Sequence, residues 1–202
     1  MTWTDWKFPS ATNLVAADGD NAWVNPANAY ANDGSTVGTG SLPKLGGNTN
    51  RRRWTGFGFD TAGGIPANAR SINGIQIELL GAVGGDTLTV WIFDGTTAGT
   101  TLTATITGTP LGSATELWGL TPTVAGIRGS GFGVELRVTN PTLGSASSNS
   151  FDALRCRVNF VGPFGQPKRW TGSTWANVEV NGWDGTQQRL VSFWDGTNWR
   201  DQ

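Results

Sequence analysis

The chain has 202 residues, of which 14% are charged, 30 are glycine and 11 are tryptophan, and its formal net charge is −1. A nearly neutral chain offers no electrostatic footprint for nucleic acid or for an anionic membrane surface, so we expect neither as a partner. Histidine is absent from the sequence, which excludes Ser-His-Asp and Cys-His nucleophiles and histidine-based zinc sites. The polar residues are mainly Gly, Thr, Asn and Ser, which favour short strands and turns over helices.

Cys156 is the only cysteine, so an intrachain disulfide is excluded. It alternates with Leu154, Val158 and Phe160, a pattern that predicts a small core residue and no nucleophile. The first residues lack a basic segment followed by an apolar run, and nowhere do 18 apolar residues occur together. We therefore expect a protein that is made in a cytoplasm and does not insert into a membrane.

Period-two alternation of apolar and polar residues predicts strands at 75–80, 87–92, 102–106, 132–138 and 154–160, each with one wet face. Weaker strand candidates lie at 3–8, 29–37 and 54–60. A short helical turn is expected at 121–128, with Thr121 as its cap and Pro122 at the first helical position. About eight strands separated by turn residues indicate an all-β fold, an antiparallel two-sheet sandwich with the jelly roll as the favoured topology.

A change of composition after the last predicted strand divides the chain. Two prolines and two glycines fall within 161–167, and a tryptophan-rich repeat begins directly afterwards. We predict a β-sandwich domain at 1–161, a Pro/Gly linker at 162–169 and Trp-rich β-hairpin repeats at 170–202. A second irregular stretch at 142–150, rich in Ser, Gly and Asn, is expected to be a mobile surface loop.

The C-terminal region repeats one short unit three times, beginning at Trp170, Trp183 and Trp194. Thr-Gly and Asp-Gly supply the φ > 0 positions of a tight hairpin turn, and tryptophans on either side form cross-strand pairs. A single hairpin is marginal in water, so we expect the units to stack on one another, on the sandwich or on another subunit.

The tryptophans support two interpretations. Trp beside Asn, Asp and Thr is typical of sugar-binding surfaces, where the ring packs on a pyranose. The same rings are needed to give small hairpins a core, and this structural interpretation is the favoured one. The ligand or partner contacts that we predict are Trp170, Trp175, Trp183, Trp194 and Trp199. The six tryptophans of the sandwich are expected in its core or between its sheets, namely Trp3, Trp6, Trp23, Trp54, Trp91 and Trp118.

Charged residues supply three further candidate sites. The run Arg51, Arg52 and Arg53 is predicted to form a solvated or interface edge, with phosphate binding as the minor alternative. Asp18 and Asp20 offer oxygen ligands for calcium, although an Asx-rich turn is the favoured interpretation. Glu78 and Glu135 lie on the polar sides of predicted strands and could form the carboxylate pair of a glycoside hydrolase, but we expect both to be solvated strand residues. We predict no catalytic residue, no metal and no cofactor.

The order of several segments resembles the β-sandwich domain that recurs in structural proteins of tailed bacteriophages. The resemblance covers roughly residues 20 to 160 and rests on the segments WVNPANA (23–29), GFGF (56–59), IPANARSINGIQI (65–77), LWGLT (117–121), GFGVEL (131–136) and FDALRCRV (151–158). The C-terminal Trp units are similar to short repeats that close other phage head and tail proteins. The resemblance implies a non-enzymatic component of the virion surface that is assembled in the host cytoplasm.

Two functional classes follow from the sequence. The first is a structural virion protein, either a head-decoration or head-fibre component or a minor tail protein, which docks on other virion proteins and forms a homo-oligomer such as a trimer. The alternative is a carbohydrate-binding adhesin whose exposed tryptophans contact host surface glycans. One protein can combine both roles.

Overall fold

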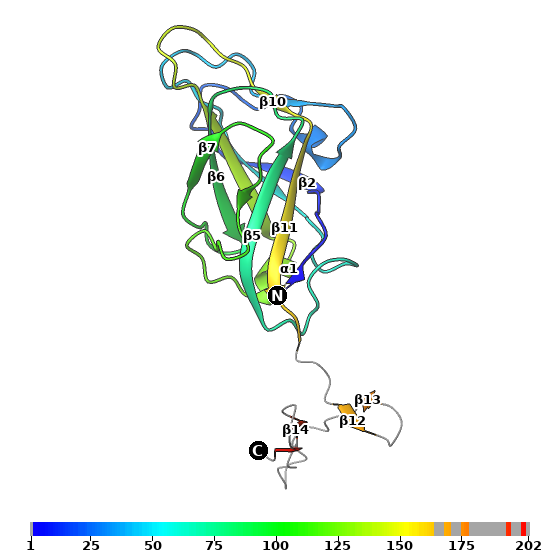
Figure 1. The fold of residues 1–202 in the computed structure, drawn as a ribbon. Coiled ribbons are helices and arrows are strands. Elements are labelled where there is room, and N and C mark those ends of the chain that lie inside the picture. Colours follow the sequence, from blue (N-terminus) through cyan, green and yellow to red (C-terminus); the bar gives the residue numbers. More distant parts are fainter. Residues whose placement is uncertain (1, 164–167, 171–174, 178–192, 195–198, 201–202) are drawn as a thin grey trace. The chain divides into compact units, whose positions relative to one another are not determined.

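The computed structural model describes residues 2–163, 168–170, 175–177, 193–194 and 199–200. The chain divides into two compact units, Met1–Pro163 and Phe164–Gln202, and the division falls within the predicted linker. The first unit is an antiparallel two-sheet sandwich, as predicted (Figure 1). Within the described residues, no helix is both long and apolar enough to cross a membrane.

The larger sheet has five strands in the order β2-β4-β9-β6-β7. Its strands are β2 (Ala11–Ala16), β4 (Arg51–Thr55), β9 (Phe132–Thr139), β6 (Thr87–Asp94) and β7 (Leu102–Thr105). The smaller sheet has the order β1-β11-β5-β8, formed by β1 (Thr2–Trp3), β11 (Ala153–Val161), β5 (Ser71–Leu80) and β8 (Leu111–Gly112). A separate short pair joins β3 (Val37–Gly38) to β10 (Ser150–Phe151).

The strand order is that of a jelly roll. Without β2 at the edge and the short β3–β10 pair, each sheet contains four strands, and every pairing is antiparallel. The first strand lies beside the last in one sheet, and the inner pair of the other sheet is β9 and β6. This arrangement, two interlocked Greek keys, confirms the favoured topology.

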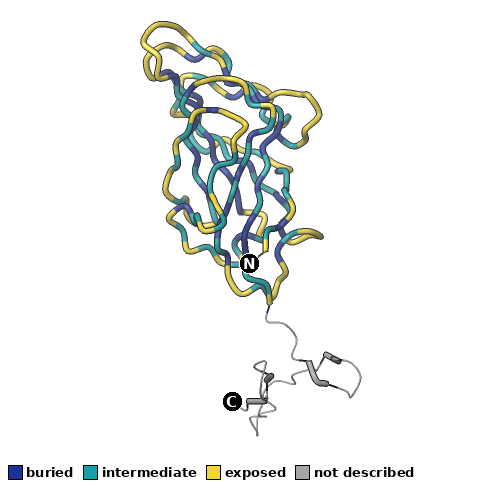
Figure 2. Tube along the Cα trace, viewed as in Figure 1, coloured by how far each residue is buried: buried dark blue, intermediate teal, exposed yellow. Residues whose placement is uncertain are grey.

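The alternation in the sequence explains how each sheet buries one face. In β5, Ile75, Ile77 and Leu79 are buried, whereas Gln76 and Glu78 point to the outer side. Burial is concentrated along the strands, and the loops at the ends of the sandwich are exposed (Figure 2). All five strands predicted from strong alternation are present in the structure.

Three tryptophans anchor the core, as predicted. Trp23 and Trp54 meet edge to face with ring centroids 5.4 Å apart, and each indole N–H donates to a backbone carbonyl. Trp118 is fully buried, and its indole N–H donates to the carbonyl of Ile75 at 3.1 Å. Trp3, Trp6 and Trp91 contradict the prediction, because they are half-buried on the outer faces of the sheets.

The weaker strand predictions were largely wrong. At 29–37 the chain forms no strand until Val37, because Asn25 adopts a left-handed conformation and Pro26 starts a 3₁₀ helix, η1 (Pro26–Tyr30). The strand expected at 54–60 instead runs from Arg51 to Thr55, and it ends where Gly56 takes a φ of 72°.

Two other boundaries also differ from the sequence prediction. Of 3–8 only Trp3 belongs to a strand, β1, which begins at Thr2, and the chain then follows β11 through single contacts such as Lys7 with Cys156. The helical turn is α1 (Val124–Arg128), an α-helix capped by Thr123 and not by Thr121. Strand β2 was not predicted at all.

In the second unit, two short antiparallel pairs bear out two of the predicted hairpins. Strand β12 (Lys168–Trp170) pairs with β13 (Trp175–Asn177), and β14 (Phe193–Trp194) pairs with β15 (Trp199–Arg200). The register sets Trp170 opposite Trp175 and Trp194 opposite Trp199. The third predicted unit, with Trp183, lies outside the described residues.

Candidate binding surface

The outer face of the five-stranded sheet carries a row of charged and aromatic side chains. Neighbouring strands β4, β9 and β6 place Arg53, Glu135 and Trp91 opposite one another. The residues on either side of Glu135 along β9, Val134 and Leu136, are buried in the core. Because successive side chains of a strand alternate between faces, Glu135 lies on the face away from the core.

Glu135 is nevertheless fully buried, with only 1% of its side chain exposed. The Nε–H of Arg53 donates to Oε1 of Glu135 at 2.6 Å, and a terminal nitrogen of the same guanidinium also contacts Oε1. Arg51 Nε lies 3.4 Å from Oε2. The expectation of a solvated glutamate is therefore wrong, because two arginines of the neighbouring strand close over the carboxylate.

Two aromatic rings from β6 complete the cover. The guanidinium carbon of Arg53 lies 3.4 Å from the ring centre of Phe93, and that of Arg51 lies 5.4 Å from the ring centre of Trp91. We call these four residues the arginine–aromatic roof: Arg51, Arg53, Trp91 and Phe93. Guanidinium over ring contacts contribute about 0.5–1 kcal/mol each at exposed sites. The roof shields Glu135 from water and fixes both arginines.

A glycine beneath the roof makes this packing possible. Gly133 lies on β9 opposite Thr55, one pleat from Glu135. A Cβ at Gly133 would lie 2.9 Å from the Cγ of Arg53 and 2.9 Å from the carbonyl oxygen of Trp54. Because Gly133 has no side chain, the side chain of Arg53 can cross β9 and reach Phe93.

A second ion pair borders the roof. Arg137 on β9 contacts the carboxylate of Asp18, and the backbone N–H of Arg51 donates to the other oxygen of Asp18 at 3.4 Å. The hydrogen bond from Arg137 lowers the pKa of Asp18 below its usual value. Three guanidiniums, those of Arg51, Arg53 and Arg137, thus face two carboxylates on one side of the sheet.

The arginine run is not the solvated edge that we predicted. Arg51 and Arg53 lie on β4, the second strand of the sheet, with side chains 31% and 20% exposed, and both pair with Glu135. Arg52 points to the opposite face, where its Nε–H donates to the hydroxyl of Thr12 at 2.8 Å. The three arginines therefore do not form one patch, because a strand sends alternate side chains to opposite faces.

The loop of Asp18 and Asp20 uses its carboxylates for internal contacts. Asp20 accepts the backbone N–H of Asn48 at 2.8 Å, while Asp18 pairs with Arg137. In the described part of the chain, no three His, Cys, Asp or Glu side chains gather around a common point that would suit a metal ion. The structure thus gives both aspartates protein partners.

The outer face of the four-stranded sheet carries a second arginine–aromatic array. The guanidinium of Arg157 lies 4.5 Å from the ring centres of both Trp3 and Trp6, and Arg155 lies 4.5 Å from Trp6. Arg155 also donates to Glu78 through its Nε–H at 2.8 Å. We call this set the tryptophan strap: Trp3, Trp6, Arg155 and Arg157. Glu78 is 13% exposed, so it is half-buried and ion-paired instead of solvated.

Glu78 and Glu135 cannot act as a catalytic pair. They lie on the outer faces of different sheets, with the sandwich core between them. Stacked sheets are about 10 Å apart before the outward reach of the side chains is added, which exceeds the carboxylate separations of glycosidases.

Cys156 is buried in the core, as its place in the alternation predicted, and burial raises the pKa of its thiol far above the usual value. An un-ionised, enclosed thiol is a poor nucleophile. Cys156 therefore contributes to packing only.

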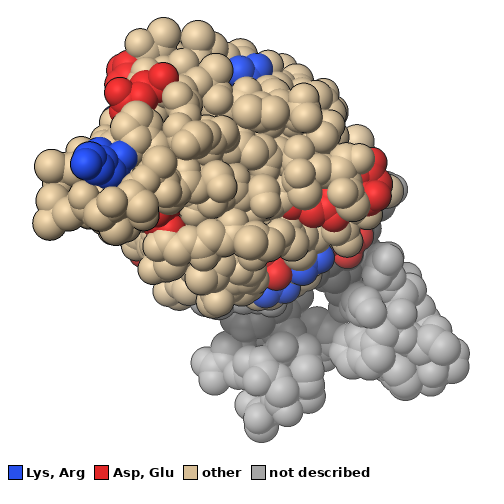
Figure 3. Space-filling view, turned by 90° about the horizontal axis from the view of Figure 1, so that it is seen from above, with Lys and Arg blue, Asp and Glu red and all other residues tan. Residues whose placement is uncertain are grey.

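One end of the sandwich presents exposed leucines. Leu45 and Leu143 are 66% and 72% exposed, and the backbone N–H of Leu45 donates to the carbonyl of Thr142, which ties the two loops together. Leu45 has a φ of 55°, an uncommon conformation for a branched side chain. Seen from this end, the surface is mostly uncharged but carries separate clusters of Lys or Arg and of Asp or Glu (Figure 3), and the exposed Lys44 directly precedes Leu45. We call Leu45 and Leu143 the leucine tip.

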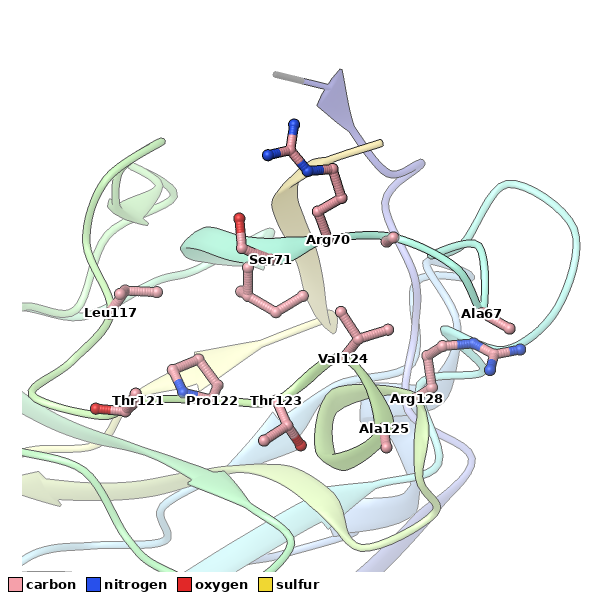
Figure 4. A pocket seen from close by; sticks show the side chains of 12 residues that line it. Ala67, Arg70, Ser71, Leu117, Thr121, Pro122, Thr123, Val124, Ala125 and Arg128 are labelled. Atoms are coloured by element: carbon pink, nitrogen blue, oxygen red, sulfur yellow. The ribbon is translucent and has the colours of Figure 1, made fainter. Parts of the chain in front are cut away.

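A shallow cavity of about 590 Å³ lies between α1 and the start of β5. Its lining includes the apolar residues Leu117, Pro122 and Val124. Figure 4 shows the guanidinium groups of Arg70 and Arg128 directed away from Pro122 and Val124. The cavity therefore lacks the convergent polar groups that orient a ligand in a specific pocket.

Of the predicted contact residues, the structure brings Arg51 and Arg53 together with Trp91, which the sequence analysis had assigned to the interior. The side chains of Trp170, Trp175, Trp194 and Trp199 are not described, so their role in ligand contact stays a prediction.

Comparisons with known proteins give one structural similarity. No protein-family profile matches the chain, and no curated protein matches it. Among solved structures, a family 32 carbohydrate-binding module of NanJ from C. perfringens, in complex with galactose, is similar to it. The similarity covers 77% of this chain and 99% of that chain, with 13% sequence identity and a TM-score of 0.36. A similarity of this size does not distinguish one β-sandwich family from another.

Proposed function

We propose that the chain is a non-enzymatic structural protein of a tailed-bacteriophage particle, exposed on the virion as a head-decoration or head-fibre protein or as a minor tail protein. It is assembled in the host cytoplasm, forms a homo-oligomer and acts by docking on other virion proteins. The resemblance of the sequence to phage β-sandwich domains is one line of support, and the surface of the sandwich is the other.

The leucine tip is the observation that carries the proposal. Two large apolar side chains that are about two thirds exposed or more, on loops held together by backbone hydrogen bonds, form a ready contact for another protein. The backbone hydrogen bonds from Leu45 to Thr142 and from Gly46 to Asn140 join the two loops, which lowers the conformational entropy that is lost on docking.

Labelling of particles tests the proposal. Electron microscopy with gold-labelled antibody is expected to show the protein on the head or on the tail of particles produced with it. The paired change Leu45→Ser and Leu143→Ser should reduce incorporation at least tenfold without loss of folding. Leu14→Ser is the matched control, because Leu14 is 49% exposed on β2, away from the tip. Particles without label would refute the virion assignment.

A second candidate function is that of a carbohydrate-binding adhesin. Trp91 favours it, because this ring is half-buried on an outer sheet face beside two arginines that are fixed by Glu135. Aromatic rings with polar neighbours are the usual lining of sugar-binding surfaces. Binding of the full chain to a glycan array tests this candidate, and retention of no glycan would refute it.

A further inference from the structure

We propose that the arginine–aromatic roof binds an acidic saccharide, one whose pyranose rings carry carboxylates. The proposal rests on the glycan-binding candidate above, and it names the ligand class and the site. It places the site on the sandwich, whereas the sequence analysis had placed glycan contact on the C-terminal tryptophans.

The guanidiniums supply the anion-binding groups. Arg51, Arg53 and Arg137 are 31%, 20% and 25% exposed at their side chains, so each reaches solvent. An arginine has five N–H donors in a planar fork, so a guanidinium that pairs with one carboxylate on one side can donate to a second acceptor on its exposed side. With three guanidiniums facing two carboxylates, the face retains a positive charge and can bind a carboxylate in the bidentate manner.

Trp91 supplies the stacking surface for a sugar ring. Arg53 lies 3.4 Å from the centre of Phe93, whereas Arg51 lies over Trp91 at 5.4 Å from the ring centre, and the Trp91 side chain is half-buried. A pyranose that packs against the indole therefore has the Arg51 guanidinium within reach of its carboxylate. The Arg53 guanidinium lies over Phe93, two residues along β6 from Trp91 and thus about 7 Å farther along the strand, where a neighbouring ring would be placed.

The roof is already organised for binding. Glu135 is buried and holds Arg51 and Arg53 from below, and Gly133 leaves the path that Arg53 occupies. A ligand would therefore bind arginines whose rotamers are fixed, which avoids about 0.5–1.5 kcal/mol of ordering cost for each side chain.

A saccharide fits this face better than an acidic peptide segment. The roof lies on the flat side of a sheet and is not a strand edge, so it offers no backbone ladder to an extended peptide. Side chains that can hydrogen-bond sugar hydroxyls lie on this face instead. They are Asn13, Thr55 and Thr89, which pair in register with Arg53, Gly133 and Arg137, respectively. These groups suit the hydroxyls of a sugar.

Calorimetric titration of the full chain tests the proposal. The probe is a β-1,4-linked trimer of mannuronic acid, and the neutral β-1,4-linked mannose trimer is its matched control. We expect the acidic trimer to bind at least tenfold more tightly than the neutral one, with an affinity that falls as salt rises. Trp91→Ala and Arg51→Gln should each weaken binding at least tenfold. The matched changes in the tryptophan strap, Trp6→Ala and Arg155→Gln, should alter it less than twofold.

Each other outcome overturns the site or its ligand class. Equal affinity for the two trimers refutes the specificity for acidic sugars. If the strap variants lose as much affinity as the roof variants, the location of the site is refuted. Tight binding of a poly-glutamate peptide without binding of the trimer would assign the roof to an acidic protein. If Trp91→Ala fails to fold, the affinity of Arg51→Gln for the acidic trimer tests the site by itself. If glycans on the array still bind the Trp91→Ala chain as tightly, the glycan-binding function stands and only this site is lost.

Discussion

The two outer faces of the sandwich use the same residue types in different ways. In both, arginines stack on aromatic rings and pair with one glutamate. The roof spans strands β4, β9 and β6 inside a sheet and buries Glu135 completely, whereas the tryptophan strap fastens an N-terminal segment along β11 and leaves Glu78 half-buried. Both arrays use inner strands, but the strap fastens an N-terminal edge segment while the roof closes over a carboxylate, so their energetic weights should differ accordingly.

The largest expected effect is that of Glu135→Gln. It leaves two half-buried guanidiniums without their carboxylate, and we expect the free energy of unfolding to fall by about 2–3 kcal/mol, below the full value for a completely buried pair. Glu78→Gln on the other face is the control, with an expected loss of about 1 kcal/mol or less. Denaturant unfolding measures both, and equal losses would show that the two faces do not differ.

Gly133→Ala tests the roof without removing a charge. The new methyl group would meet the carbonyl oxygen of Trp54 at 2.9 Å and displace Arg53, so we expect a loss of about 1–3 kcal/mol. Gly85→Ala is the matched control, because its Cβ would have no neighbour within 4 Å and the expected change is within about 0.5 kcal/mol. A stable Gly133→Ala variant would mean that Arg53 does not need this path.

Trp6→Ala should act locally. The ring lies between Arg155 and Arg157, and its loss should let the N-terminal segment open while the sheets remain folded. Hydrogen exchange is expected to accelerate at the amides of Thr4 and Lys7, which donate to β11, and to stay unchanged in β9. Acceleration throughout both sheets would contradict the peripheral role of the strap.

The smallest expected effect concerns pH. The folded-state pKa of Asp18 is lowered, chiefly by the hydrogen bond from Arg137, so the unfolded chain binds the proton more tightly. The stabilisation is present above about pH 4, the unfolded value, and is lost as pH falls through the folded value. Asp18 is 46% exposed, so the effect should be well below 1 kcal/mol. The free energy of unfolding, measured from pH 7 to pH 2, should fall less steeply at acid pH for Asp18→Asn than for the unchanged chain. Equal slopes would refute this.

The sequence predicted the sheets better than it predicted the roof. Period-two alternation located the five long strands because each buries one face, but Trp91 was assigned to the interior and lies half-buried on the outer face of β6. It missed the ring's partners, because Arg51, Glu135 and Trp91 lie on strands that are far apart in the chain and meet only through the register. Arg51 and Arg53 at alternate positions before a buried Trp54 were the available signal.

The neighbouring position of β1 and β11 has a mechanical consequence. The register sets Thr2 opposite Phe160, so tension applied at the start of β1 and at the end of β11 would load their hydrogen bonds one after another and unzip them at low force. Tension between the end of β11 and the leucine tip would instead run along the strands, from one end of the sandwich to the other, and load many hydrogen bonds at once (Figure 1). The sandwich would thus resist pulling far better along its long axis than between its two termini.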